Sequence, residues 1–201
     1  AMIEAFGLDR PALVGHSFGA SVCLRYATGR PRSLTALVLV DGRASFGEAG
    51  SRYMKLLGIL GPAAYPTLEE AARKFRPLPK ETIAEAVVIE HVARHGFRDE
   101  GGRWTSKFDR LALASQAPFD LENRIADLEF PVLFVRGEHS RVLSSATAAR
   151  LAGICRRGSV VEIPGAHHHV PIDRPDRLGI EIREFLRRAA GESQTPPRVL
   201  S

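Results

Sequence analysis

LVGHSFGAS, residues 13–21, decides the fold of this chain. It contains a G-x-S-x-G pattern with Ser17 at its centre. The aliphatic run from Ala12 to Val14 predicts a strand, and Ala20 to Thr28 predict a helix that ends at Gly29. Between such elements the pattern forms a sharp turn that lifts the serine oxygen clear of the sheet. Ser17 is therefore the first candidate for a nucleophile.

Small residues around Ser17 are expected to be physically required. A side chain at Gly15 or Gly19 is expected to collide with the tight backbone of the turn. Ala20 is expected to keep the helix close to its strand. The turn therefore predicts a close contact between strand and helix.

The rest of the chain alternates between buried strands and helices. Continuous apolar runs predict strands at Leu34 to Val40, Pro131 to Val135 and Val160 to Ile163. Helical patterns cover Ser145 to Ala152 and Pro175 to Arg188, and Ala1 to Leu8 are predicted to be the end of a helix. This alternation predicts an α/β fold with a parallel sheet flanked by helices.

Residues 46–127 interrupt the alternation. They contain helix signals, a capping box at Thr67 to Glu70 and a helix from Lys80 to His95, but no convincing strand. We therefore expect a core made of residues 1–45 and 128–190 with a helical insertion between them. The tail, residues 191–201, is polar and is expected to be disordered.

The quoted motif, together with LVLVD, PVLFVRGEHS and IPGAHHHVPIDRP, resembles the α/β-hydrolase superfamily from its nucleophile strand to its last helix. The resemblance implies a partial α/β-hydrolase sheet and a catalytic triad in the order serine, acid, histidine. It also implies that residues 46–127 are a lid.

The same resemblance assigns the base and offers two acids. His168 occupies the position of the catalytic histidine and would take the proton of Ser17. The family's usual acid position falls on Ser140, whereas some similar enzymes place the acid at the position of Asp41. We choose Asp41 and expect it, rather than the alternative Glu138, within hydrogen-bond reach of His168.

The resemblance also implies an oxyanion hole made by the backbone amide of Phe18 and a second amide from an earlier loop. In complete family members more strands precede the nucleophile, so this chain resembles an N-terminally truncated member. Loss of one oxyanion donor costs roughly 100- to 1,000-fold in turnover. We therefore expect low activity from the chain as written, with Ala12 to Val14 as an exposed edge.

Three further residues are candidates for substrate binding: His16, Trp104 and Phe108. Trp104 and Phe108 either line an acyl pocket or attach the lid to the sheet. No metal site is predicted, because three consecutive histidines, His167 to His169, have poor geometry for one, and His167 and His169 are expected to point away from His168. His91 and His95 lack the glutamate of H-E-x-x-H and are expected to face solvent.

The composition bears on the number of domains, the possible partners and the cellular compartment. The chain has 201 residues, 44% of them hydrophobic, which suits one core. Its 28 Lys plus Arg against 23 Asp plus Glu are scattered, so a nucleic-acid partner is not expected. No apolar run approaches the roughly 18 residues of a membrane helix. Two distant cysteines and no visible signal peptide predict a cytoplasmic protein, and the oligomeric state is left open.

The predicted function is cofactor-independent hydrolysis, through an acyl-serine, of a small and largely apolar ester, lactone or carbon–carbon bond substrate. One alternative is a non-catalytic ligand-binding protein on the same fold. A second is a transferase that uses the same acyl-serine. A fluorophosphonate probe separates an enzyme from a receptor.

Overall fold

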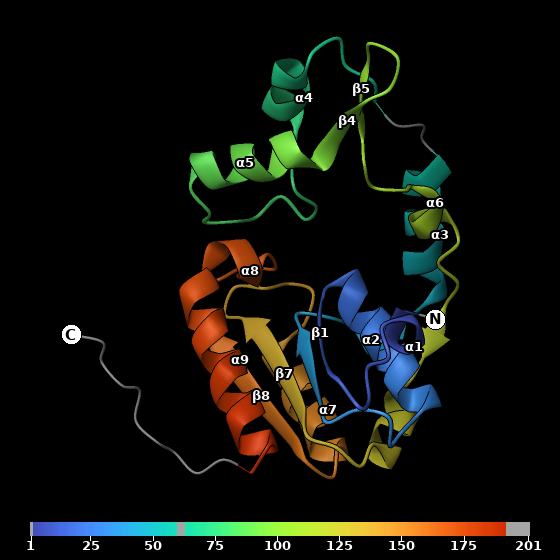
Figure 1. Ribbon diagram of the computed structural model, residues 1–201, viewed down its shortest axis with the longest axis vertical. Helices are drawn as coiled ribbons and strands as arrows, with labels where there is room; N and C mark the ends of the chain where they lie inside the picture. The colour runs from blue at the N-terminus through green and yellow to red at the C-terminus, as the bar shows by residue number, and fades with distance from the viewer. Residues whose placement is uncertain (1, 60–62, 192–201) are drawn as a thin grey trace, which may run out of the picture. The chain divides into compact units, whose positions relative to one another are not determined.

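The structure is a computed structural model that describes residues 2–59 and 63–191. It divides into two compact units. The first unit runs up to Ala44 and resumes at Leu121, and the second comprises Ser45–Asp120. Figure 1 shows the elements of both units. The predicted disordered tail lies outside the described residues, apart from Gly191.

The first unit is built on a four-stranded parallel sheet. Its strands are β1 (Ala12–His16), β2 (Ala36–Val40), β7 (Val132–Gly137) and β8 (Gly158–Ile163), in the order β1-β2-β7-β8. His16 pairs with Val40 in the register of β1 and β2, and Val40 pairs with Val135 in that of β2 and β7. The prediction of a parallel sheet is confirmed, with each predicted strand within two residues of its observed start.

Helices cover both faces of this sheet (Figure 1). The helices of the first unit are α1 (Met2–Ala5), α2 (Phe18–Gly29), the 3-10 helix η1 (Glu122–Asp127), α7 (Ser145–Ile154), α8 (Val170–Asp173) and α9 (Pro175–Ala189). Alternate residues of β2, including Val38 and Val40, pack with Leu178 and Phe185 of α9. Helices α2 and α7 pack against β2 and β7 respectively. Because both faces are covered, every residue of β2 and β7 is buried.

The outer strands are less buried. β1 lies at one edge of the four-stranded sheet, and Val14 is 49% exposed. The predicted exposed edge at Ala12 to Val14 is therefore present in this chain. An unpaired strand edge of this kind is a template for pairing with another chain.

The second unit contains both helices and short strands. Its elements are β3 (Ser45–Phe46), α3 (Glu48–Ile59), α4 (Leu68–Lys74), α5 (Ala86–Gly96), β4 (Phe97–Asp99), β5 (Trp104–Ser106), α6 (Leu111–Ala114) and β6 (Phe119–Asp120). β3 pairs with β6, and β4 pairs with β5, both antiparallel. The expectation of no strand here was wrong. Runs of two or three residues are too short to show a period of two in the sequence.

Helix signals in this unit were predicted with mixed success. The Thr67 side chain accepts a hydrogen bond from the Glu70 amide, so the predicted cap of α4 is confirmed. The predicted helix from Lys80 was too long, because α5 begins at Ala86.

The predicted N-terminal helix of the first unit was also too long. It was expected to reach Leu8, whereas α1 ends at Ala5 and Gly7 has a φ of 60°. Among the described residues, no helix has both the length and the apolar character needed to cross a membrane.

Candidate active site

Ser17 stands in a strained turn between β1 and α2. Its φ of 54° and ψ of −118° are conformations that non-glycine residues rarely adopt. Its backbone is fixed on both sides: the amide donates to the Val40 carbonyl (2.9 Å), and the carbonyl accepts from the Ala20 amide (3.1 Å). Ser17 is the N-cap residue of α2 but makes no side-chain capping bond. Its hydroxyl is therefore directed to another partner.

The turn depends on Gly15 but not on Gly19. A Cβ at Gly15 would lie 2.5 Å from the Gly19 carbonyl oxygen and 2.8 Å from the Ala20 Cα, so no side chain fits. A Cβ at Gly19 would meet nothing within 4 Å, and the predicted collision there was wrong. Gly19 contributes its backbone carbonyl to the close contact with Gly15, and the space that its own side chain would occupy is open.

A third glycine, which the sequence reasoning missed, also makes room for the turn. A Cβ at Gly42 would lie 2.3 Å from the Ala20 Cβ and 3.2 Å from the Ser17 carbonyl oxygen. Ala20 and Gly42 thus bring α2 against the end of β2. The only sequence signal was a glycine directly after the strand-end aspartate.

His168 links Ser17 to Asp41. Its Nε2 lies 2.8 Å from the Ser17 Oγ, and its Nδ1 lies 2.6 Å from the Asp41 Oδ2. The His168 side chain is 4% exposed and the Asp41 side chain is fully buried. Asp41 thus lies within hydrogen-bond reach of His168, as expected from the sequence. All three residues follow the carboxyl ends of parallel strands, which share one edge of the sheet.

Asp41 is held by two further donors, one at the end of β7 and one in the loop that follows it. The Ser140 hydroxyl donates to its Oδ2 (2.5 Å), and the Gly137 amide approaches its Oδ1 at 3.4 Å. The Asp41 backbone has a φ of 46°, so it is strained as Ser17 is. A buried carboxylate is stable only when its oxygens are satisfied in this way.

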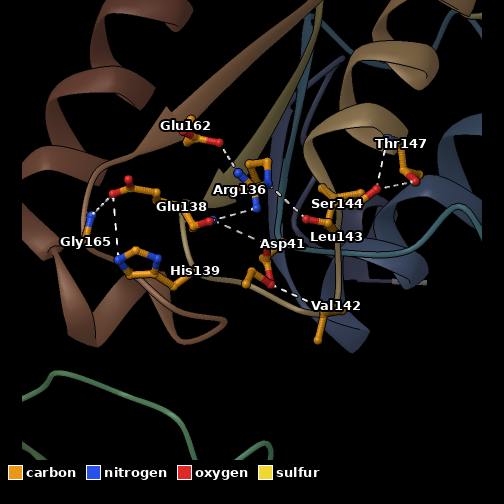
Figure 2. Close-up of polar contacts among 12 residues, drawn as sticks. Asp41, Arg136, Glu138, His139, Val142, Leu143, Ser144, Thr147, Glu162 and Gly165 are labelled. Atoms are coloured by element: carbon orange, nitrogen blue, oxygen red, sulfur yellow. Dashed lines mark hydrogen bonds and ion pairs between the residues drawn. The ribbon is translucent and has the colours of Figure 1, made fainter.

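Glu138, the alternative acid, has other partners. Its carboxylate accepts from the Gly165 amide (2.7 Å) and lies 3.9 Å from the His139 Nε2. Figure 2 shows the Glu138 side chain directed towards Gly165 and His139. The neighbouring Arg136 is buried and bonds the Glu138 carbonyl, the Leu143 carbonyl and the Glu162 carboxylate, which fixes this loop (Figure 2).

The loop that carries His168 is fastened to the end of β7. The His139 amide donates to the Ala166 carbonyl (2.9 Å), and a Cβ at Gly137 would lie 2.1 Å from the His167 carbonyl oxygen. The buried Asp173 accepts from the His167 amide (2.8 Å). These contacts hold the loop backbone directly before His168.

His16 and His169 flank His168. The His16 Nε2 donates to the His168 carbonyl (2.8 Å), and the two rings lie 5.0 Å apart. Burial lowers the pKa of His16, which favours the neutral form of this imidazole. The His169 ring lies 5.0 Å from that of His168 and 6.1 Å from that of His16. The expectation that His169 points elsewhere was wrong, whereas the His167 ring lies beside His139.

Trp104, Phe108, His91 and His95 belong to the second unit. Trp104 pairs through its backbone with Tyr65 and Asp99, and Phe108 is half exposed. His91 and His95 are exposed on α5 as predicted, with their rings 4.2 Å apart. Near Ser17, the Phe18 amide lies in the first turn of α2, where backbone N–H groups have no intrahelical acceptor.

Comparison with known proteins identifies the family. The model of the alpha/beta hydrolase family matches residues 1–179. The chain belongs to the alpha/beta hydrolase family. The parallel sheet with helices on both faces and the strained serine turn are features of an alpha/beta hydrolase.

Two relatives of this alpha/beta hydrolase are 26% and 25% identical to it. One is the "Putative carbamate hydrolase RutD" of Klebsiella pneumoniae, 26% identical over 197 residues, which cover 92% of this chain and 68% of RutD. Another is the 2-(acetamidomethylene)succinate hydrolase of Mesorhizobium japonicum, 25% identical over 188 residues, with 92% and 67% covered. These relatives are hydrolases, and they support a hydrolase of the alpha/beta family here.

A solved structure shows the same fold. The crystal structure of an E-2-(acetamidomethylene)succinate hydrolase matches with a TM-score of 0.77 and 23% identity, over 92% of this chain and 69% of that one. The chain therefore aligns with about two thirds of the length of these relatives.

Proposed function

We propose that this chain is a serine hydrolase whose catalytic triad is Ser17, His168 and Asp41. The observation that carries the proposal is the series of two short hydrogen bonds from Asp41 through His168 to Ser17, 2.6 Å and 2.8 Å long. The nucleophile, base and orienting acid of an acyl-transfer enzyme need this order of contacts.

The proposed mechanism follows from these contacts. Asp41 accepts a hydrogen bond from the Nδ1–H of His168, which leaves the lone pair of Nε2 facing the Ser17 hydroxyl. As the Ser17 oxygen attacks a carbonyl carbon, Nε2 takes its proton, and Asp41 stabilises the imidazolium. The same proton then passes to the leaving group, and an acyl-serine remains. Water, activated by His168, breaks the acyl bond and regenerates Ser17.

Negative charge that develops on the carbonyl oxygen needs donors. The Phe18 amide stands directly after the nucleophile, at the N-terminus of the 12-residue helix α2, whose dipole favours an anion. We assign it to the oxyanion hole. Because the donor comes from the backbone, it is in place before the reaction and needs no reorganisation.

The proposed substrate is a small, largely apolar ester, lactone or carbon–carbon bond substrate, processed without a cofactor. The second unit is proposed as the lid, with Trp104 and Phe108 as apolar contacts, and His16 as a polar contact beside the base. The relatives are named for a carbamate and for an acetamido compound. Both names describe a carbonyl next to nitrogen, so a substrate panel should include carbamates and N-acyl compounds beside esters.

Covalent labelling tests the proposal. A fluorophosphonate probe should label the chain at Ser17, as peptide mass spectrometry would show. Ser17→Ala should not be labelled at this position, and His168→Ala should label at least ~100-fold more slowly. Equal labelling of the folded Ser17→Ala variant would overturn the proposal. Hydrolysis of p-nitrophenyl esters and carbamates by wild type and Ser17→Ala then ranks substrates. Acyl transfer to an added alcohol in competition with water would instead indicate a transferase.

A further inference from the structure

We propose that His16, His168 and His169 form a binding site for a divalent transition metal such as Zn²⁺, and that the bound metal switches off Ser17. One ring nitrogen from each histidine lies within 4.8 Å of those of the other two. The effect on Ser17 rests on the proposed function, whereas the metal site itself does not.

The three imidazoles converge from two parts of the chain. His16 ends β1, and His168 and His169 follow β8 in the loop before α8. Tetrahedral zinc binds imidazole nitrogen at about 2.0 to 2.1 Å, which places neighbouring ligand nitrogens roughly 3.4 Å apart. Small side-chain rotations therefore bring the three nitrogens onto one ion. A water molecule can occupy the fourth position.

His168 and His16 each have the outer partner that a metal ligand needs. A metal-bound imidazole nearly always donates its other N–H to a carboxylate or a backbone carbonyl, which fixes the ring and its tautomer. His168 donates Nδ1–H to Asp41 at 2.6 Å. His16 donates Nε2–H to the His168 carbonyl at 2.8 Å, which leaves its Nδ1 with the lone pair. Proximity alone would not supply these partners.

The geometry makes metal binding and catalysis mutually exclusive. The only lone pair of neutral His168 that Asp41 leaves available is on Nε2, and this nitrogen faces the Ser17 hydroxyl. A metal on Nε2 occupies the electron pair that would take the Ser17 proton. Ser17 then keeps its proton and stays a weak nucleophile. Inhibition should be reversible, because no covalent bond in the protein changes.

Direct binding of Zn²⁺ tests the site without any reaction. Isothermal titration calorimetry should show binding by wild type. His169→Gln should weaken binding at least about tenfold, because loss of a direct ligand costs no less than the loss of an outer partner. Two matched controls are His167→Gln, next to the site but beside His139, and His95→Gln, which removes the exposed pair on α5. Both should bind as wild type does. Zn²⁺ binding lost with His95→Gln and kept with His169→Gln would overturn the proposal.

Labelling of Ser17 tests the consequence. For each variant, the fluorophosphonate labelling rate with Zn²⁺ is divided by its own rate in EDTA. Zn²⁺ should slow labelling of wild type, EDTA should restore it, and His169→Gln should need at least tenfold more Zn²⁺ for the same protection. Equal protection of His169→Gln and wild type would overturn the inhibitory site. Absence of labelling even in EDTA would instead count against the proposed function, and calorimetry would still decide on the metal site.

A spectroscopic measurement covers the case in which His169→Gln does not fold. Co²⁺ bound by wild type in place of Zn²⁺ should show the strong visible absorption of a four-coordinate ion, because three imidazoles and water make a tetrahedral set. If the site is fully occupied by Co²⁺ but shows only the weak absorption typical of six-coordinate cobalt, the proposed tetrahedral site is contradicted.

Discussion

The Ser140 hydroxyl lies 2.5 Å from the Asp41 carboxylate, although the two residues are 99 positions apart in the sequence. Ser140 follows β7 and Asp41 follows β2, and these strands are neighbours in the sheet. Side chains from both positions therefore reach the same point beside His168. A carboxylate at either position is expected to serve the same imidazole.

This convergence predicts that the acid can be moved. Asp41→Asn should slow fluorophosphonate labelling by roughly 10³- to 10⁴-fold, because the imidazole loses the acceptor that fixes its tautomer. Asp41→Ser combined with Ser140→Asp should label at least tenfold faster than Asp41→Ser alone. If the double variant is folded and no faster, the position of Ser140 cannot supply the acid.

Glu138 gives the matched comparison for the acid. Glu138→Gln keeps the shape of the side chain, and the carboxylate that it removes contacts Gly165 and His139 rather than His168. We expect its labelling rate to stay within about twofold of wild type, a change of under 0.5 kcal/mol. A loss as large as that of Asp41→Asn would assign the acid to Glu138 instead.

The two glycines of the serine turn should differ sharply. Gly15→Ala places a methyl group 2.5 Å from the Gly19 carbonyl oxygen and should lower the free energy of unfolding by about 1 to 3 kcal/mol. Gly19→Ala meets nothing within 4 Å and lies in α2, so stability should be unchanged or higher. Urea unfolding of both variants measures the difference. Equal destabilisation by both would contradict the observed turn.

Cys155 should be unreactive while the protein is folded. Burial raises the pKa of its thiol to about 12, so almost no thiolate exists at pH 8. Iodoacetamide should modify Cys155 at pH 8 only after urea is added, as mass spectrometry of its peptide would show. Modification at equal rates with and without urea would contradict the burial.

The raised pKa of Cys155 also makes the free energy of unfolding depend on pH. The folded protein holds the Cys155 proton more tightly than the unfolded chain, whose cysteine titrates near 9.0. This contribution to stability is complete below pH 9 and is lost as the pH rises from 9 towards 12. Cys155→Ala should therefore show a weaker loss of stability across this range. If the stabilities of wild type and Cys155→Ala depend on pH in the same way, Cys155 does not make this contribution.

The sequence predicted the elements whose signals are local. The sequence around Ser17 predicts a strand, a turn and a helix from neighbouring residues. The strands β2 and β7 are buried on both faces, so they appear in the sequence as continuous apolar runs. The strands β4 and β5 could not be found in this way. Each has three residues, and their pairing depends on a turn through Gly101 and Gly102 at positive φ.

Tertiary contacts explain the errors in the site. The family resemblance offered Asp41 and His168, but the bond from Ser140 to Asp41 joins two loops and has no sequence signal. The position of His169 depends on how the chain turns into α8, where His169 is the N-cap residue. For Gly19, the pattern alone did not reveal which glycine supplies space and which supplies backbone.

The pairing of β3 with β6 has a consequence for engineering. Ser45 pairs with Asp120, and the Leu121 amide donates to the Ala44 carbonyl at 3.0 Å, so the chain leaves the first unit and returns to it at one point. An inserted segment whose ends already meet can be exchanged at little cost in loop-closure entropy. Residues 45–120 thus form a cassette: a short turn, or the corresponding segment of a related hydrolase, could replace them while the sheet keeps its connections.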